Sequence, residues 1–174
     1  NYISHVIIGL DKADKEQFLH ASHFFSKLNK PFSLLWNDGP RLRAIHDELE
    51  DMQLAPTELG KGRNVWYCIG LAHARGKAEA LAIHDCDITT YDRSLLARLF
   101  YPIANPNFQF EFCKGYYARV ADGKMNGRVS RLLVKPLLLA MEKVLGPNDY
   151  INFMKSFRYP LAGEFSFRRS LIPE

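Results

Sequence analysis

The sequence predicts a mixed α/β fold with a mainly parallel sheet flanked by helices. Short apolar runs alternate with stretches of helical periodicity through the first half of the chain, which is typical of strand–helix–strand units. Acidic residues follow these runs at Asp11, Asp38 and Asp85. Ligands of such sheets gather at the carboxyl ends of the strands, so the fold prediction also indicates where a site should lie.

The expected elements follow one another in order. Apolar runs predict strands at 5–10, 32–36 and 81–84, and helical spacing predicts helices over 15–28, 42–52 and 64–75. In the second half, Phe108, Phe110 and Phe112 alternate and predict a strand that runs to Val120. An amphipathic helix is expected to open at 126–128, and Pro136 should kink or break it.

Composition limits the class of protein. A chain of 174 residues with 47% hydrophobic residues can bury one substantial core, so a single domain is expected. The net charge of +4 suits an anionic ligand. The three cysteines lack metal-type spacing, and the longest apolar stretch is too short to span a bilayer. A cytoplasmic, soluble protein is therefore expected.

The most informative motif is Asp85-Cys86-Asp87, which directly follows an apolar run. Residues two apart on an extended chain project to the same side, so two carboxylates could hold Mg²⁺ or Mn²⁺ against a diphosphate. The motif could also be a solvated turn before a helix. His84 adjoins the pair but should point to the opposite face, so a packed histidine is expected there rather than a metal ligand.

Three further segments have a functional and an ordinary interpretation. The start of a helix at 126–130 could bind phosphate or carboxylate, or could be an ordinary cap. The basic loop at 60–63 could hold a nucleotide, or be merely solvated. Glu164 lies beside a glycine among apolar residues, where it could bind a sugar hydroxyl or sit on a surface.

The segment 114–120 partly resembles an RNA-recognition strand, but Tyr117 stands where a small residue is required.

Taken in order, these motifs resemble glucosyl-3-phosphoglycerate synthases, which are retaining glycosyltransferases of the GT-A fold related to mannosylglycerate synthases. The resemblance runs from about Val6 onward. It implies transfer of glucose from a nucleotide diphosphate sugar, with UDP-glucose the expected donor, to 3-phosphoglycerate. The alternatives are a mannosylglycerate synthase-type enzyme that uses GDP-mannose, and a non-catalytic RNA-binding domain.

The resemblance also implies the roles of particular residues. Asp85 and Asp87 would hold the metal, Mg²⁺ or Mn²⁺, and the diphosphate, and Glu164 would act with Asp87 at the catalytic centre. The nucleotide sugar would be bound by Asp11 and Lys61 together with the Asp pair. The acceptor would be bound by Gly127, Arg128, Val129 and Ser130, with serine in place of the threonine common in the family.

The family pattern extends beyond this sequence at both ends. Members begin with an earlier strand and a nucleotide-binding loop, and they continue to a further histidine metal ligand. The expectation is therefore a single GT-A-like domain over residues 1–174, truncated at both ends. The expected partners are the two substrates and a second copy in a homodimer, without nucleic acid or membrane.

Overall fold

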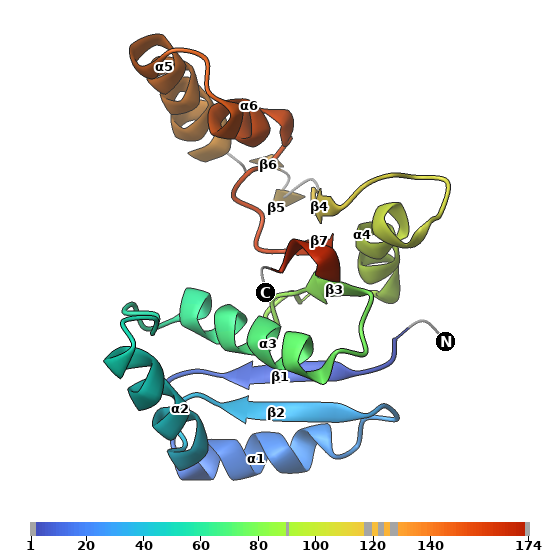
Figure 1. The fold of residues 1–174 in the computed structure, drawn as a ribbon. Coiled ribbons are helices and arrows are strands. Elements are labelled where there is room, and N and C mark those ends of the chain that lie inside the picture. Colours follow the sequence, from blue (N-terminus) through green and yellow to red (C-terminus); the bar gives the residue numbers. More distant parts are fainter. Residues whose placement is uncertain (1–2, 90, 117–119, 122–123, 126–128, 173–174) are drawn as a thin grey trace. The chain divides into compact units, whose positions relative to one another are not determined.

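The computed structural model describes residues 3–89, 91–116, 120–121, 124–125 and 129–172. By its backbone contacts the chain forms two compact units, Asn1–Glu79 and Ala80–Glu174 (Figure 1). No helix among the described residues is long and apolar enough to cross a membrane. The single domain expected over 1–174 stays a prediction.

The first unit is built on a parallel pair of strands. β1 (Val6–Leu10) and β2 (Phe32–Trp36) pair in register from Val6 opposite Phe32 to Leu10 opposite Trp36. α1 (Lys15–Phe25) is the crossover connection that parallel strands require. α2 (Pro40–Asp51) and α3 (Lys61–Arg75) follow, and α3 packs along β1 (Figure 1). Both strands therefore end at the same edge, as the sequence predicted.

Local signals fix where the helices begin. Asp14 accepts a hydrogen bond from the Gln17 amide, at 2.8 Å, and donates its own amide to the Gln17 side chain, which forms a reciprocal capping box for α1. Gly60 precedes α3 with a φ of 125°, a conformation that favours glycine. The segment predicted as a basic loop is thus helical from Lys61 onward, three residues before the predicted start of the helix.

The second unit contains an antiparallel sheet. β3 (Ala80–Ile83), β7 (Phe165–Arg168) and β4 (Phe112–Lys114) lie in the order β3-β7-β4, with both pairings antiparallel. The mixed α/β class is confirmed, but among the described strands the parallel pairing is confined to β1 and β2. The reason is that β7, from the end of the chain, inserts between two strands that the sequence places far before it.

The helix α4 (Arg93–Ala104) packs against all three strands of this sheet. Ser166 of β7 is completely buried, and its hydroxyl donates to the Leu99 carbonyl oxygen at 2.7 Å. A buried hydroxyl needs such a partner, because it has lost its bonds to water. This bond fixes α4 on the middle strand of the sheet.

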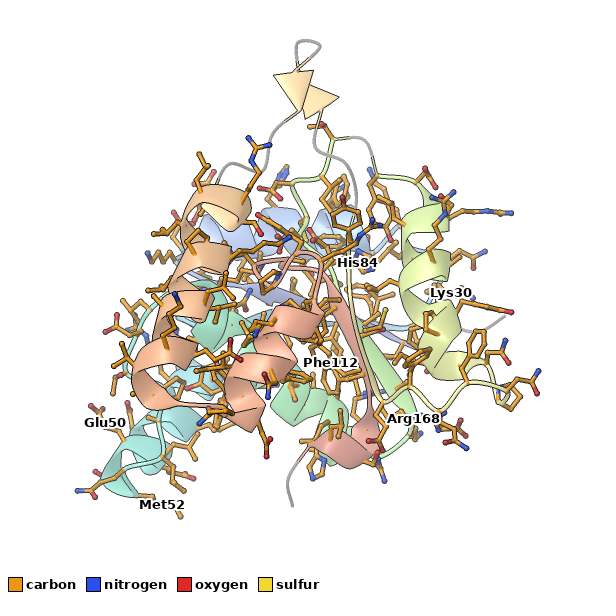
Figure 2. All side chains as sticks on the ribbon, turned by 90° about the horizontal axis from the view of Figure 1, so that it is seen from above. Lys30, Glu50, Met52, His84, Phe112 and Arg168 are labelled. Atoms are coloured by element: carbon orange, nitrogen blue, oxygen red, sulfur yellow. The ribbon has the colours of Figure 1, made fainter. Side chains whose placement is uncertain are left out.

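Aromatic side chains attach α6 (Asp149–Ser156) to the same sheet. The ring of Phe112 stacks on Phe165 with centroids 5.7 Å apart, and lies 6.2 Å from Phe153 and 5.8 Å from Phe157. Figure 2 shows Phe112 beside α6. The cluster gives this short helix an apolar anchor in the sheet.

The predicted strand over 108–120 is wrong in length, since β4 covers residues 112–114 and neither 108–111 nor 115–116 is in a strand; residues 117–119 lie outside the described residues. A turn at Asn105 takes the backbone groups that a strand would use: the Asn107 amide donates to the Asn105 side chain at 2.9 Å, and the Phe108 amide to the Asn105 carbonyl at 3.0 Å. Phe110 is 56% exposed. Alternation of aromatic residues was therefore not sufficient to form a strand.

A π-helix, η1 (Ser130–Val134), leads into α5 (Lys135–Leu145). The Lys135 amide donates to the Ser130 carbonyl, and Pro136 follows, which has no amide to donate. Pro136 was predicted to kink or break the helix; instead the backbone stays helical, and its hydrogen bonding changes from π to α type just before Pro136. The short strands β5 (Val120–Ala121) and β6 (Lys124–Met125) pair antiparallel before it, and a 3₁₀ helix (Arg169–Leu171) follows β7.

The apolar face predicted for this helix is not buried within the described residues. Leu132, Leu133 and Leu137 are 65%, 58% and 51% exposed, whereas Leu138 is 8% exposed. A π-turn contains more residues than an α-turn, so spacing counted across residues 130–138 does not define one continuous face.

We predict that Ser166→Ala lowers the free energy of unfolding by about 1 kcal/mol, because it removes a buried hydrogen bond. Ser156→Ala is the matched control. Its hydroxyl also donates to a carbonyl at 2.7 Å, that of Phe153, but the bond is exposed, so the expected change is within about 0.5 kcal/mol. Urea unfolding of the two variants measures the difference. Equal losses would contradict the role given to Ser166.

Candidate functional site

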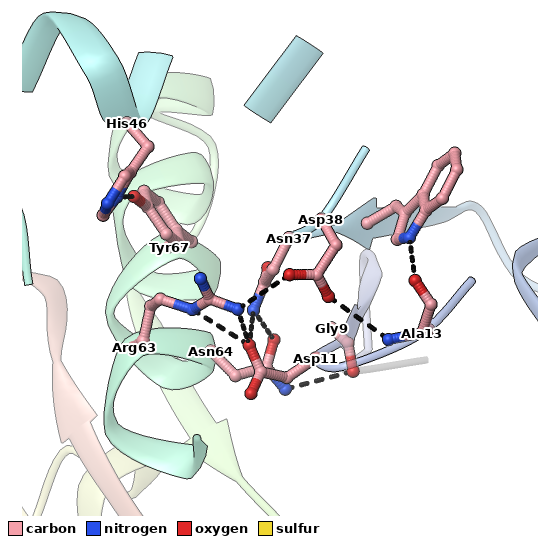
Figure 3. Close-up of polar contacts among 10 residues, drawn as sticks. Gly9, Asp11, Ala13, Asn37, Asp38, His46, Arg63, Asn64 and Tyr67 are labelled. Atoms are coloured by element: carbon pink, nitrogen blue, oxygen red, sulfur yellow. Dashed lines mark hydrogen bonds and ion pairs between the residues drawn. The ribbon is translucent and has the colours of Figure 1, made fainter. Parts of the chain in front are cut away.

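A polar cluster lies where β1 and β2 end, and we call it the strand-end cluster. It contains Asp11, Asn37, Asp38, Arg63 and Asn64 (Figure 3). The first three residues directly follow the two parallel strands, and the last two come from the first turns of α3. The edge predicted from the sequence is therefore occupied by polar side chains from three segments.

Arg63 is the centre of the strand-end cluster. Its side chain is 7% exposed, and its guanidinium donates to the Asp11 carboxylate through both Nε, at 3.0 Å, and Nη2. Nη2 also lies 3.2 Å from Asp38 Oδ1. Despite burial, which acts in the opposite direction, the bonds from Asn37 and Arg63 lower the pKa of Asp11 below its ordinary value. Arg63 and Asp11 are thus a charged pair at neutral pH.

The amide side chains extend this network into the strand. The Asn37 side-chain amide donates to Asp11 at 3.0 Å and to Asn64 at 3.1 Å, and Asn64 donates to the Gly9 carbonyl at 3.1 Å. A Cβ atom on Gly9 would lie 2.1 Å from Asn64 Oδ1. Glycine is therefore required at position 9 for α3 to approach β1 this closely.

Two oxygens of the strand-end cluster keep unused hydrogen-bonding capacity. Asp11 Oδ2 and Asn37 Oδ1 are buried and have no hydrogen-bond partner among the described residues. Both are acceptors, so a ligand that presents N–H or O–H groups would satisfy them. Asp11 was predicted to bind the nucleotide, and only its second oxygen is available for that, because Arg63 and Asn37 bind the first. Lys61, also predicted near the nucleotide, is exposed in the first turn of α3.

A pocket of about 260 Å³ lies in the second unit, and we call it the Glu164 pocket. It opens between α4 and the ends of β3 and β4. Its polar lining consists of His84, Arg98, Cys113, Lys114, Tyr116 and Glu164, and Ile88, Leu95 and Leu99 supply the apolar wall. A single water needs only roughly 10–15 Å³, so the pocket has room for a small organic group.

Glu164 lies immediately before β7 and is 4% exposed. Its backbone carbonyl accepts from the Gly115 amide at 2.8 Å, which ties the residue to the end of β4. Its side-chain Oε2 is buried and has no partner among the described residues. The sequence offered either a polar cleft or an exposed surface for Glu164, and the structure shows the cleft.

His84 lines the same pocket. Its ring packs edge-on against Tyr91 with centroids 5.4 Å apart, and both ring nitrogens are buried without a hydrogen-bond partner among the described residues. Burial lowers the pKa of His84, against the opposite effect of the Glu164 and Asp85 carboxylates. The packed histidine expected from the sequence is therefore also a pocket residue with two unsatisfied polar atoms.

The Asp85–Asp87 pair follows β3, but not on an extended strand. β3 ends at Ile83, and Cys86 and Asp87 form a turn. Asp87 is exposed and Asp85 is partly buried. In the part of the chain that the structure describes, no three His, Cys, Asp or Glu side chains form a metal-binding group. Two hard carboxylates still suit Mg²⁺, which is commonly held by one or two carboxylates together with substrate phosphates.

Only part of the predicted acceptor segment can be located. Gly127 and Arg128 lie outside the described residues. Val129 is 55% exposed, whereas Ser130 is 6% exposed and its hydroxyl has no partner among the described residues. A hydroxyl without a partner can still donate or accept a hydrogen bond from a ligand.

The segment that resembles an RNA-recognition strand is only partly described, because residues 117–119 lie outside the described residues. Tyr116 lies beyond the end of β4 at Lys114, and the Arg158 guanidinium lies over its ring, 4.9 Å from the centroid. The RNA-binding alternative therefore stays a prediction.

The chain is similar to two curated proteins that are both named glucosyl-3-phosphoglycerate synthase. The glucosyl-3-phosphoglycerate synthase of Persephonella marina is 42% identical over 170 residues, which cover 98% of this chain and 42% of the relative. That of Methanococcoides burtonii is 39% identical over 173 residues, again 98% of this chain and 42% of the relative. The predicted resemblance is confirmed. The chain spans less than half the length of these curated relatives; no family model and no solved structure matches it.

Sequence reasoning missed two residues that the structure makes prominent. Arg63 was placed in a flexible loop, although it lies in the first turn of an α-helix next to two strand ends and there bonds to both Asp11 and Asp38. His84 was assigned away from the site by strand alternation. That rule fails at this residue, because β3 ends one residue earlier.

We predict that Arg63→Ala lowers the free energy of unfolding by about 3 kcal/mol, since it leaves two carboxylates without their cation. Arg75→Ala, in the last turn of the same helix and exposed, is the matched control and should change stability by less than about 0.5 kcal/mol. Chemical denaturation followed by circular dichroism compares the two. Similar effects would show that the Arg63 ion pairs are not important for folding.

The depressed pKa of Asp11 leads to a pH prediction. Its ionised form is stabilised in the folded state, so its contribution is complete above the unfolded pKa of about 3.9 and is lost as the pH falls through the folded value. Asp11→Asn should therefore be destabilising at pH 7, and the difference from wild type should shrink at about pH 3 and below. Unfolding midpoints at several pH values, with exposed Glu50→Gln as control, test this. If the stability difference between wild type and Asp11→Asn grew as the pH fell, the role given to the Asp11 charge would be wrong.

Proposed function

We propose that this chain is part of a glycosyltransferase that moves glucose from a nucleotide diphosphate sugar to 3-phosphoglycerate and forms glucosyl-3-phosphoglycerate. The observation that carries this proposal is the 42% identity, over 98% of the chain, to a relative named for that product. UDP-glucose is the proposed donor. The proposed enzyme acts without nucleic acid or membrane, in the cytoplasm, as a homodimer.

The strand-end cluster supports a role in nucleotide binding. Its unpartnered oxygens, on Asp11 and Asn37, are acceptors and would pair with N–H or O–H groups of a base or ribose. Lys61 would add a positive charge near the phosphates. The free N–H groups at the start of α3 carry partial positive charge, so they also favour an anion such as a phosphate.

Asp85 and Asp87 are the residues of this chain that would hold a divalent metal. When bound, Mg²⁺ or Mn²⁺ would neutralise the charge that builds on the leaving diphosphate. The two carboxylates would orient the diphosphate through it, with Asp87 as the more exposed and accessible ligand.

Glu164 and the acceptor segment supply the remaining groups. The buried Glu164 carboxylate would accept hydrogen bonds from sugar or acceptor hydroxyls and hold them in position. Gly127, Arg128, Val129 and Ser130 would bind the phosphoglycerate. The sequence offers no evident protein nucleophile, so the proposed route is attack by the acceptor hydroxyl on the same face that the diphosphate leaves, with retention of configuration.

We predict that the complete enzyme, given UDP-glucose, 3-phosphoglycerate and Mg²⁺, forms glucosyl-3-phosphoglycerate and releases UDP. Mass spectrometry of the products measures this directly. Parallel reactions with GDP-mannose and glycerate test the mannosylglycerate-type alternative. If product formed only from GDP-mannose and glycerate, these would be the substrates instead. If neither pair gave product, the proposal would be overturned.

We predict that Arg128→Ala raises the KM for 3-phosphoglycerate about tenfold or more, because a charge-assisted contact to an anion is worth about 1.5–3 kcal/mol. Arg128→Lys should restore only part of the loss, since an ammonium group cannot make the bidentate contact. Donor affinity measured without acceptor should hardly change. If donor binding fell while the acceptor KM stayed constant, Arg128 would belong to the nucleotide site.

A further inference from the structure

Two residues that line the Glu164 pocket carry three buried polar atoms without a hydrogen-bond partner among the described residues. They are both ring nitrogens of His84 and Oε2 of Glu164. Buried polar side-chain atoms in folded proteins are partnered in the large majority of cases. Three exceptions within one pocket indicate a place where a ligand supplies the missing partners.

The chemistry of these atoms defines the ligand. A neutral imidazole has one donor nitrogen and one acceptor nitrogen, whereas a carboxylate only accepts. A hydroxyl group donates and accepts, so it can bond to either nitrogen of His84, whichever carries the proton. Neighbouring hydroxyls of a sugar could therefore bond to His84 and Glu164 at the same time.

The surroundings of His84 suit a binding role better than a purely structural one. Tyr91 packs against the ring in an edge-on contact at an interplanar angle of 88°. Leu95, Leu99 and Ile88 form an apolar wall in the same pocket, which can cover the C–H face of a sugar ring. Pockets that combine apolar walls with a few fixed polar groups are typical of small-molecule sites.

The position of His84 in the chain connects the pocket to the proposed donor. His84 directly precedes Asp85, the first carboxylate of the pair proposed to hold the diphosphate. In a nucleotide diphosphate sugar, the sugar is bonded to the terminal phosphate. A pocket one residue away from the diphosphate ligands is therefore in the right place for the sugar.

We propose that His84 binds a hydroxyl group of the donor sugar beside Glu164, and so helps to determine which sugar is transferred. This inference rests on the proposed function and adds to it a specificity-determining residue. The residue touches the substrate through its ring nitrogens, and its ring is held in place by Tyr91.

The test uses His84→Phe in the complete enzyme, which keeps a ring against Tyr91 but removes both nitrogens. We expect affinity for UDP-glucose to fall about tenfold, the usual effect of losing one hydrogen bond to a ligand, while affinity for UDP stays within about twofold. Calorimetry with Mg²⁺ present measures both. His84→Gln, which keeps a donor and an acceptor, should recover part of the loss.

Deoxy analogues of UDP-glucose identify the hydroxyl. For the analogue that lacks the hydroxyl bound by His84, the losses from His84→Phe and from the missing hydroxyl should not add. For the other analogues they should add. Additivity for every analogue would overturn the inference, even if the enzyme is fully active with UDP-glucose.

Two controls separate folding effects from binding effects. Because the His84 nitrogens have no hydrogen-bond partners among the described residues, His84→Phe should not lower the melting temperature. His73→Phe removes another histidine with a buried, unpartnered nitrogen, in α3 and outside the pocket, and it should not alter the preference for UDP-glucose over UDP. An equal fall in UDP and UDP-glucose affinity with a lower melting temperature would show that His84 is structural.

A measurement on the unmodified enzyme distinguishes the failure of this inference from the failure of the proposed function. The imidazole nitrogen resonances of His84 should shift when UDP-glucose is added, but much less with UDP. If no product forms with UDP-glucose but the resonances shift with GDP-mannose, the proposed substrates are wrong and the role of His84 stands. If product forms without such a shift, the function stands and the inference is wrong.

Discussion

A buried arginine between two strand ends is the interaction on which the first unit depends. The Arg63 guanidinium would be strongly unfavourable in an apolar environment without partners, and the chain supplies Asp11 after β1 and Asp38 after β2. Because the three residues come from three segments, their ion pairs hold α3 and both strands in one arrangement. The close approach of Asn64 to Gly9 belongs to the same arrangement.

The second unit also contains a buried polar group with a hydrogen-bond partner, but here both groups are uncharged. Ser166 is buried in the middle strand of the sheet, and its hydroxyl is satisfied by the Leu99 carbonyl of α4. The aromatic side chains around Phe112 then bring α6 onto the sheet through apolar contacts alone. Ser166 thus has its partner, whereas buried atoms of His84, Ser130 and Glu164 have none among the described residues.

Among the described residues, the buried groups without a hydrogen-bond partner, apart from His73 in α3, coincide with the positions where a ligand is proposed. They are Asp11 and Asn37 in the strand-end cluster, His84 and Glu164 in the pocket, and Ser130 at the start of the π-helix. Unpartnered buried groups weaken the free protein, and proteins commonly accept such a cost at binding sites. The similarity to glucosyl-3-phosphoglycerate synthases and the distribution of these groups therefore both support the proposed substrate-binding site.

The sequence by itself determined the strand–helix order of the first unit and the ends of β2. These features depend on a local property, the periodicity of apolar residues. The sequence also determined the resemblance to a family of sugar-transferring enzymes, because an ordered set of motifs needs no knowledge of which residues touch.

Only the tertiary structure decided which strands pair and which polar side chains are satisfied. β7 joins β3 and β4 from more than fifty residues beyond β4 in the chain, and no local signal encodes that pairing. In the same way, Arg63 and His84 look like a loop arginine and a packed histidine in the sequence. Their different roles follow from long-range contacts: Arg63 meets two carboxylates from distant strands, and His84 meets none that bonds to its ring nitrogens among the described residues.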